Sequence, residues 1–145
     1  MQNPPPSYGS YGAPPPPPGD AKVIGLAPNV AAMLCYTPCC IIGLVISIIV
    51  IVTEKVNRLA RFHAMQSLLL HAAGFAVGIV LGIIAAVLGA ASDVMLLLFQ
   101  IIQGVFGLGF LVVAIMCMVK ANGGEFYKLP TIGDIAEKQT GGAQY

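Results

Sequence analysis

The sequence FHAMQSLLLHAAGFAVGIVLGIIAAVLGAAS, residues 62–92, contains no Asp, Glu, Lys or Arg. Residues 23–53 and 94–119 are also without these charged side chains. A helix needs about 20 apolar residues to cross the hydrocarbon core of a bilayer, so each stretch is long enough to cross it. The sequence therefore predicts an all-α membrane protein. We expect a three-helix transmembrane bundle with spans near 30–52, 68–91 and 96–119.

The composition of the whole chain supports this prediction. Of its 145 residues, 57% are hydrophobic and 9% are charged, whereas soluble domains carry about 25% charged residues. The net charge of +1 provides no basic field for nucleic acid, and we expect the lipid bilayer as the surrounding partner. We expect residues 1–22 to be a disordered tail rich in Pro, Gly and Tyr, residues 23–138 to be the membrane domain, and residues 139–145 to be a flexible tail.

The distribution of basic residues predicts the orientation. In a three-span chain, the first loop and the C-terminus share one side, and that side holds six of the seven basic residues. Basic residues favour the cytoplasmic side, so we expect a cytoplasmic C-terminus in a cell membrane, most simply a bacterial inner membrane. However, Pro38 interrupts the first span and must kink or break its helix. An alternative is a helix that ends near Thr37 and re-enters from Cys39, which places both termini in the cytoplasm.

One face of the second predicted span carries small and polar residues. At 100° per residue, this face holds His63, Ser67, His71, Gly74, Gly78, Gly82, Ala85 and Gly89. Small residues four apart allow close helix approach in membranes, as in a glycine zipper. The sequence therefore predicts helix packing along this face.

The third predicted span also has a face of small and polar residues, which could pack against this one. Its members are Gln100, Gln103, Gly104 and Gly107. The first span has a similar arc with Tyr36, Cys40, Gly43 and Ser47. Buried glutamine side chains seek partners on neighbouring helices. These faces predict a compact bundle, and they leave room for a second copy or another membrane protein.

The sequence shows no set of residues for enzyme chemistry. It has no Ser/His/Asp set, phosphate-binding loop or paired carboxylates, so we expect no enzyme activity and no cofactor. His63 and His71 are the only histidines, and on a helix they lie about 12 Å apart, too far to bind one metal ion. Their expected role is packing and hydrogen bonding. Four cysteines form no zinc-binding pattern.

A polar motif between the first two spans resembles a known family. The residues are Arg58, Arg61, Phe62, His63, Gln66 and Ser67, in the pattern Arg-Phe-His-Ala-x-Gln-Ser. The C-terminal sequence GGEFYKLP, with Gly124, Tyr127 and Pro130, is similar to the ending of the same family. This family comprises small bacterial membrane proteins of unknown function and looks distantly related to the Tic-twenty-like import component of the chloroplast inner envelope. We expect the motif residues to anchor the chain at the cytoplasmic surface, and the alternative is a contact site for lipid or a partner.

The C-terminal region contains two local signals. Gly123 and Gly124 are suited to end the third span through a left-handed residue. Residues 131–138 have the pattern of a short interfacial helix. Two functions remain open at this stage. The first is a non-enzymatic assembly or scaffold component. The second is a transport or translocation component, with Ser67, His71, Gln100 and Gln103 lining a path.

Overall fold

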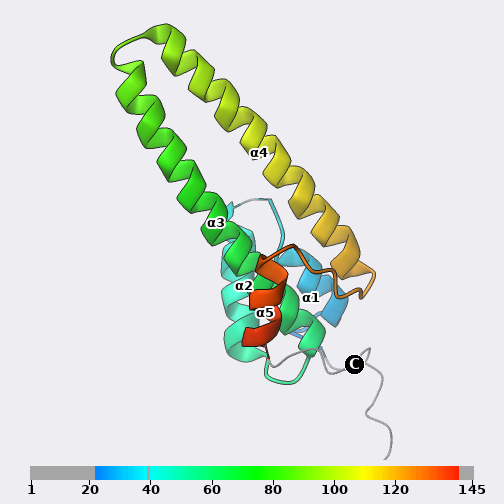
Figure 1. Ribbon diagram of the computed structural model, residues 1–145. Coiled ribbons are helices and arrows are strands. Elements are labelled where there is room, and N and C mark those ends of the chain that lie inside the picture. The colour runs from blue at the N-terminus through cyan, green and yellow to red at the C-terminus, as the bar shows by residue number, and fades with distance from the viewer. Residues whose placement is uncertain (1–21, 39, 141–145) are drawn as a thin grey trace, which may run out of the picture.

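A computed structural model describes residues 22–38 and 40–140, which form five helices. The first two are short: α1 (Pro28–Leu34) and α2 (Cys40–Thr53). The next two, α3 (Arg58–Gly89) and α4 (Asp93–Asn122), form a long antiparallel hairpin, and α5 (Ile132–Gln139) follows. Helices α1, α2 and α5 gather around one end of the hairpin, and its other end extends away from them (Figure 1).

Two of the three predicted spans are helices long and apolar enough to cross a membrane. The span predicted at 68–91 lies in α3 and the span at 96–119 lies in α4. Helix α3 begins ten residues earlier than the predicted span because the Asn57 side chain caps it, accepting a hydrogen bond from the Ala60 backbone N–H at 3.1 Å. The prediction of an all-helical chain is confirmed for the described residues, but a bundle of three helices is not what the structure contains.

The first predicted span is wrong as a single crossing, because it consists of α1 and α2 running in opposite directions. Asn29, at the start of α1, donates a hydrogen bond to the Asn122 carbonyl at the end of α4. Gly43, near the start of α2, lies beside the His71 ring, well along α3. Helix α2 then returns to the turn that begins α3, as Figure 1 shows. With 14 residues, α2 is only about 21 Å long, so the alternative with a re-entrant pair agrees with the structure.

The reversal has a local cause at residues 35–38. Pro38 cannot donate a backbone hydrogen bond, and α1 ends before it, with the Thr37 hydroxyl donating to the Leu34 carbonyl. Helix α2 passes close to this reversal at Gly43. A Cβ atom at residue 43 would lie 2.7 Å from the carbonyl oxygens of Cys35 and Thr37. Glycine is therefore required there for the two helices to meet.

The five helices divide the molecule into two regions. The polar base comprises residues 22–38 and 40–71 together with residues 112–140. The outer hairpin comprises residues 76–105, the far parts of α3 and α4 with their connecting turn. In the outer hairpin only Ala85 is buried, whereas the base contains two buried clusters and six buried polar side chains.

The C-terminal segment returns to the base after α4 ends. Gly123 follows the helix, and Gly124 adopts a positive φ of 74°, which L side chains rarely tolerate. The predicted glycine termination of this helix is therefore confirmed. The short helix predicted at 131–138 is present as α5 at Ile132–Gln139. The tail predicted at 1–22 lies outside the described residues except for Lys22, and the tail at 139–145 does so except for its first two residues.

Candidate functional site

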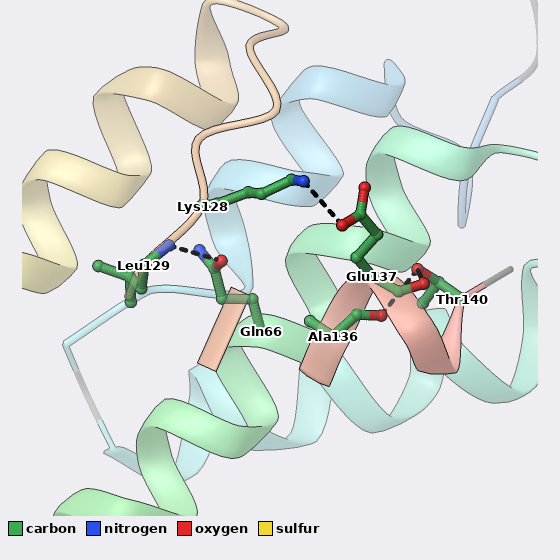
Figure 2. Close-up of polar contacts among 6 residues, drawn as sticks. All are labelled: Gln66, Lys128, Leu129, Ala136, Glu137 and Thr140. Carbon is green, nitrogen blue, oxygen red and sulfur yellow. Dashed lines mark hydrogen bonds and ion pairs between the residues drawn. The ribbon is translucent and has the colours of Figure 1, made fainter. Parts of the chain in front are cut away.

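Gln66 is the centre of a buried hydrogen-bond network in the base. Its amide nitrogen donates to the Tyr36 hydroxyl at 2.9 Å and to the Tyr127 carbonyl at 3.1 Å. Its amide oxygen accepts from the Leu129 backbone N–H at 3.1 Å, as Figure 2 shows. One fully buried side chain of α3 thus joins the end of α1 to the segment that follows α4.

His63 continues this network and its protonation follows from its partners. Its Nε2 lies 2.8 Å from the Glu125 carbonyl, which can only accept, so Nε2 carries the proton. In the neutral ring, Nδ1 then accepts from the Tyr36 hydroxyl at 3.1 Å. Because Tyr36 also accepts from Gln66, each of the three side chains has a fixed role as donor or acceptor. The network therefore specifies one arrangement of α1, α3 and the segment at 125–129.

Ser67 and His71 hold the end of α1 from the next turn of α3. The Ser67 hydroxyl donates to the Cys35 carbonyl at 2.6 Å. The His71 Nδ1 lies 2.8 Å from the Ser67 carbonyl, so Nδ1 is the protonated nitrogen of this ring. The Ser47 hydroxyl of α2 donates to the Gly43 carbonyl at 2.7 Å and lies 3.4 Å from the Cys35 carbonyl. These contacts satisfy backbone groups that the break between α1 and α2 leaves without helical partners.

Helix α5 is fastened to the same part of α3. Lys128 and Glu137 form an ion pair at 2.7 Å, and the Thr140 hydroxyl donates to the Ala136 carbonyl at the end of the helix (Figure 2). A Cβ atom at Gly133 would lie 2.9 Å from the Gln66 amide oxygen and 2.8 Å from the Lys128 Cβ. The buried face of α5 therefore packs closely on the Gln66 network.

The rest of the polar motif lies at the start of α3. Phe62 is buried, with its ring 5.6 Å from that of Phe126. Arg58 is exposed, and Arg61 donates through Nη1 to the Lys55 carbonyl at 3.3 Å. In the preceding turn, the backbone N–H groups of Asn57 and Val56 donate to Glu54 and hold the pKa of its carboxyl below the usual value. The motif thus has a buried part and an exposed basic part.

The C-terminal motif residues have separate positions. Gly124 forms the turn after α4, the Tyr127 carbonyl accepts from Gln66, and Pro130 is exposed just before α5. The sequence predicted Gly124 and Tyr127 as motif residues but gave no indication of their partner on α3. It also missed Glu125, Leu129 and Gly133 as contacts of His63 and Gln66. For Gly133, the one signal available in the sequence was its position three residues after Pro130.

The predicted packing residues of the outer part are brought together only in part. Gly74 faces the Phe110 ring, and a Cβ at Gly82 would lie 3.6 Å from the Gln103 amide nitrogen. Gln103 also approaches the Gly78 carbonyl, at 3.5 Å. By contrast, a Cβ at Gly78, Gly104 or Gly107 would meet nothing within 4 Å. Helices α3 and α4 are therefore not in close contact at those three glycines, and Gln100 is exposed.

The buried polar side chains of the base have a structural role, because they join α3 to the end of α1 and to the segment after α4. Five polar side chains are fully or almost fully buried there: Tyr36, His63, Gln66, Ser67 and His71. Three of them, His63, Gln66 and Ser67, hydrogen-bond to backbone groups outside the helices, those of Cys35, Glu125, Tyr127 and Leu129. At the depth of the hydrocarbon core, such backbone is tolerated only where it is buried in protein or lines a water-filled cavity. Among the described residues, no group of three or more His, Cys, Asp or Glu side chains could hold a metal ion.

Comparison with known proteins gives matches that cover most of the chain. The Magnetosome magnetite crystal formation protein family matches residues 27–136. A UPF0132 membrane protein of Methanocaldococcus jannaschii is 32% identical over 79% of this chain and 90% of its own length. A UPF0132 membrane protein of Archaeoglobus fulgidus is 34% identical over 79% of this chain and 96% of its own length. No solved structure matches the chain significantly. These relatives are archaeal, so the bacterial family and the Tic-twenty-like relation remain predictions.

Proposed function

Because this chain belongs to the Magnetosome magnetite crystal formation protein family and its relatives are named membrane proteins, we propose that it is a non-enzymatic scaffold component of a membrane. In this proposal the outer hairpin of α3 and α4 crosses the bilayer twice, and the polar base lies at one surface. The base presents the exposed basic residues and α5 to the adjoining aqueous phase. The chain would act by assembling with itself or with other membrane proteins.

The distribution of polar side chains is the observation that carries this proposal. Ser67 and His71 are buried in the base and hydrogen-bonded to backbone, whereas Gln100 is exposed on the outer hairpin. Gln103, three residues after Gln100, approaches the Gly78 carbonyl at 3.5 Å. These four residues therefore do not join into a continuous polar path, which favours a scaffold over a transport or translocation component.

The orientation follows from the reversal at Pro38. All seven Lys and Arg residues of the chain, from Lys22 to Lys138, lie in or beside the base, and the turn of the hairpin carries only Asp93. Basic residues favour the cytoplasmic side of a membrane. We therefore propose that both termini are cytoplasmic in a multi-pass protein of the cell membrane, a bacterial inner membrane being one such setting. The three-span chain expected from the sequence would instead place the N-terminus on the outer side.

Self-association has a specific candidate surface on α4. Gln100 is exposed amid apolar side chains, and Gly104, on the same face, has open space around it. An exposed glutamine at membrane depth gains from a partner on a neighbouring helix, and a glycine nearby permits close approach. A second copy, related by a two-fold axis, could supply both.

Purified protein in nanodiscs and liposomes tests this function. We expect a defined oligomer by native mass and no ion flux above that of empty liposomes. The variants Gln100→Leu and Gly104→Ile should shift the mass toward the monomer, and Gly109→Ile, also in open space but two positions outside the predicted set, serves as the control. A flux that His71→Leu abolishes while the mass stays unchanged would instead support the transport component.

A further inference from the structure

A cavity of about 360 Å³ lies where the base meets the outer hairpin. Its lining includes Pro38 at the reversal between α1 and α2, and Gly74 and Phe75 from α3. Phe106 and Phe110 contribute aromatic rings from α4. Because glycine and phenylalanine dominate the lining, the cavity walls are almost entirely apolar. Its volume suits a small ligand, since ligand pockets are commonly about 300–1,000 Å³.

His71 is the polar side chain of this wall, and one of its nitrogens is unused. Its Nδ1 donates to the Ser67 carbonyl at 2.8 Å, so in the neutral ring Nε2 is an acceptor. The His71 side chain is almost fully buried, and Nε2 has no hydrogen-bond partner within residues 22–38 and 40–140. A buried acceptor without a partner is unfavourable, and a donor supplied by a ligand would remove that penalty.

The ring is also held in place for such a role. The contact with Ser67 fixes its tautomer, and the Phe110 ring meets it edge-on, with centroids 5.8 Å apart. Gly43 of α2 lies close to the imidazole, since a Cβ at that residue would be 3.3 Å from His71 Cε1. A ligand would therefore meet a preformed acceptor on a rigid wall, which lowers the entropic cost of binding.

We propose that this cavity binds an apolar, ring-containing molecule of the phenol class, whose hydroxyl donates a hydrogen bond to His71 Nε2. The aromatic walls favour a planar ring, and the single acceptor selects a single hydroxyl. A metal ion is disfavoured as the occupant because the walls offer it only one ligand. A lipid acyl chain would fill the apolar volume but leave Nε2 without a donor.

The test compares 4-propylphenol with 4-propylanisole, which has the same ring and propyl chain but no donor. Both are titrated into the purified full-length protein in nanodiscs labelled with ¹⁵N-histidine, which gives signals from only two rings, His63 and His71. We expect the phenol to bind about tenfold more tightly, since one hydrogen bond to a buried acceptor is worth roughly that factor. We also expect it to shift the ¹⁵N signal of His71 Nε2 and to leave that of His63 in place.

Two variants complete the experiment. His71→Leu should bind the two probes equally, because the acceptor is gone. Gly107→Leu adds a bulky side chain to a residue of the cavity wall at which a Cβ meets no protein atom within 4 Å, so we expect it to fill part of the cavity and to bind neither probe. Its oligomeric mass is measured alongside to separate lost binding from lost assembly. Equal binding of both probes to the unsubstituted protein, a shift of His63 alone, or no binding at all would overturn the proposal.

Discussion

The polar base and the outer hairpin share two helices and differ in what surrounds them. In the base, the first turns of α3 carry His63, Gln66 and Ser67, and each has a hydrogen-bond partner from another segment. In the outer hairpin, large apolar side chains such as Ile79, Ile83 and Val105 are exposed on both helices. The bilayer can cover such side chains, but it offers no partner to irregular backbone. The comparison shows that tertiary contacts concentrate where lipid cannot substitute for protein.

Substituting Gln66 should produce the largest difference between the two regions. Gln66→Leu removes the contacts to Tyr36, Tyr127 and Leu129 and leaves buried polar groups without partners. We expect it to lower the free energy of unfolding by about 2–4 kcal/mol, measured by denaturant titration in detergent micelles. The matched control is Gln103→Leu in the outer hairpin, whose single contact is 3.5 Å long. Equal losses in the two variants would contradict the division into two regions.

Adding one methyl group to Gly43 should have the next largest effect. The Cβ of Gly43→Ala would lie 2.7 Å from two carbonyl oxygens of the reversal, and overpacking of this kind costs about 1–3 kcal/mol. The same detergent titration measures the loss. Hydrogen exchange of the backbone N–H groups of residues 35–37, which donate to the carbonyls of Ala31, Met33 and Leu34, should become faster as well. An unchanged stability would mean that α2 does not pass this close to the end of α1.

Replacing a glycine of the outer hairpin with alanine should change the free energy of unfolding in the opposite direction and by a smaller amount. A Cβ at Gly78 meets nothing within 4 Å, and alanine is favoured over glycine inside a helix by about 0.5–1 kcal/mol. Gly78→Ala should therefore raise the stability of the monomer slightly in the same titration. A loss as large as that of Gly43→Ala would restore the expectation, drawn from the glycine spacing, that α3 and α4 approach closely at this residue.

The sequence predicts those features that depend on local pattern. Apolar length located α3 and α4, Pro38 located the break in the first predicted span, and Gly124 located the end of α4. Each of these follows from a few neighbouring residues, because hydropathy, a missing N–H group and a positive φ act locally. The direction that the chain takes after Pro38 is not local, and therefore both a full crossing and a re-entrant pair were compatible with the sequence.

The partners of the polar motif could not be predicted for the same reason. Gln66 and Leu129 are 63 residues apart, and His63 and Glu125 are 62 apart. Periodicity placed His63 and Ser67 on one face of a helix, but it cannot say whether that face meets backbone, lipid or another helix. The glycine face shows the same limit, since a Cβ at Gly74 would meet the Phe110 ring whereas a Cβ at Gly78 on the same arc would meet nothing within 4 Å.

The sidedness of three positions tests the re-entrant arrangement most directly. Single cysteines are introduced as Lys22→Cys before α1, Ser92→Cys in the turn of the hairpin, and Lys138→Cys in α5, and cells are labelled with an impermeant maleimide before and after lysis. The unsubstituted chain carries four cysteines, of which Cys35 and Cys117 are buried, and its own labelling gives the background to be subtracted. The account predicts that positions 22 and 138 are labelled only after lysis and that position 92 is labelled in intact cells. Labelling of position 22 together with position 92 would contradict it.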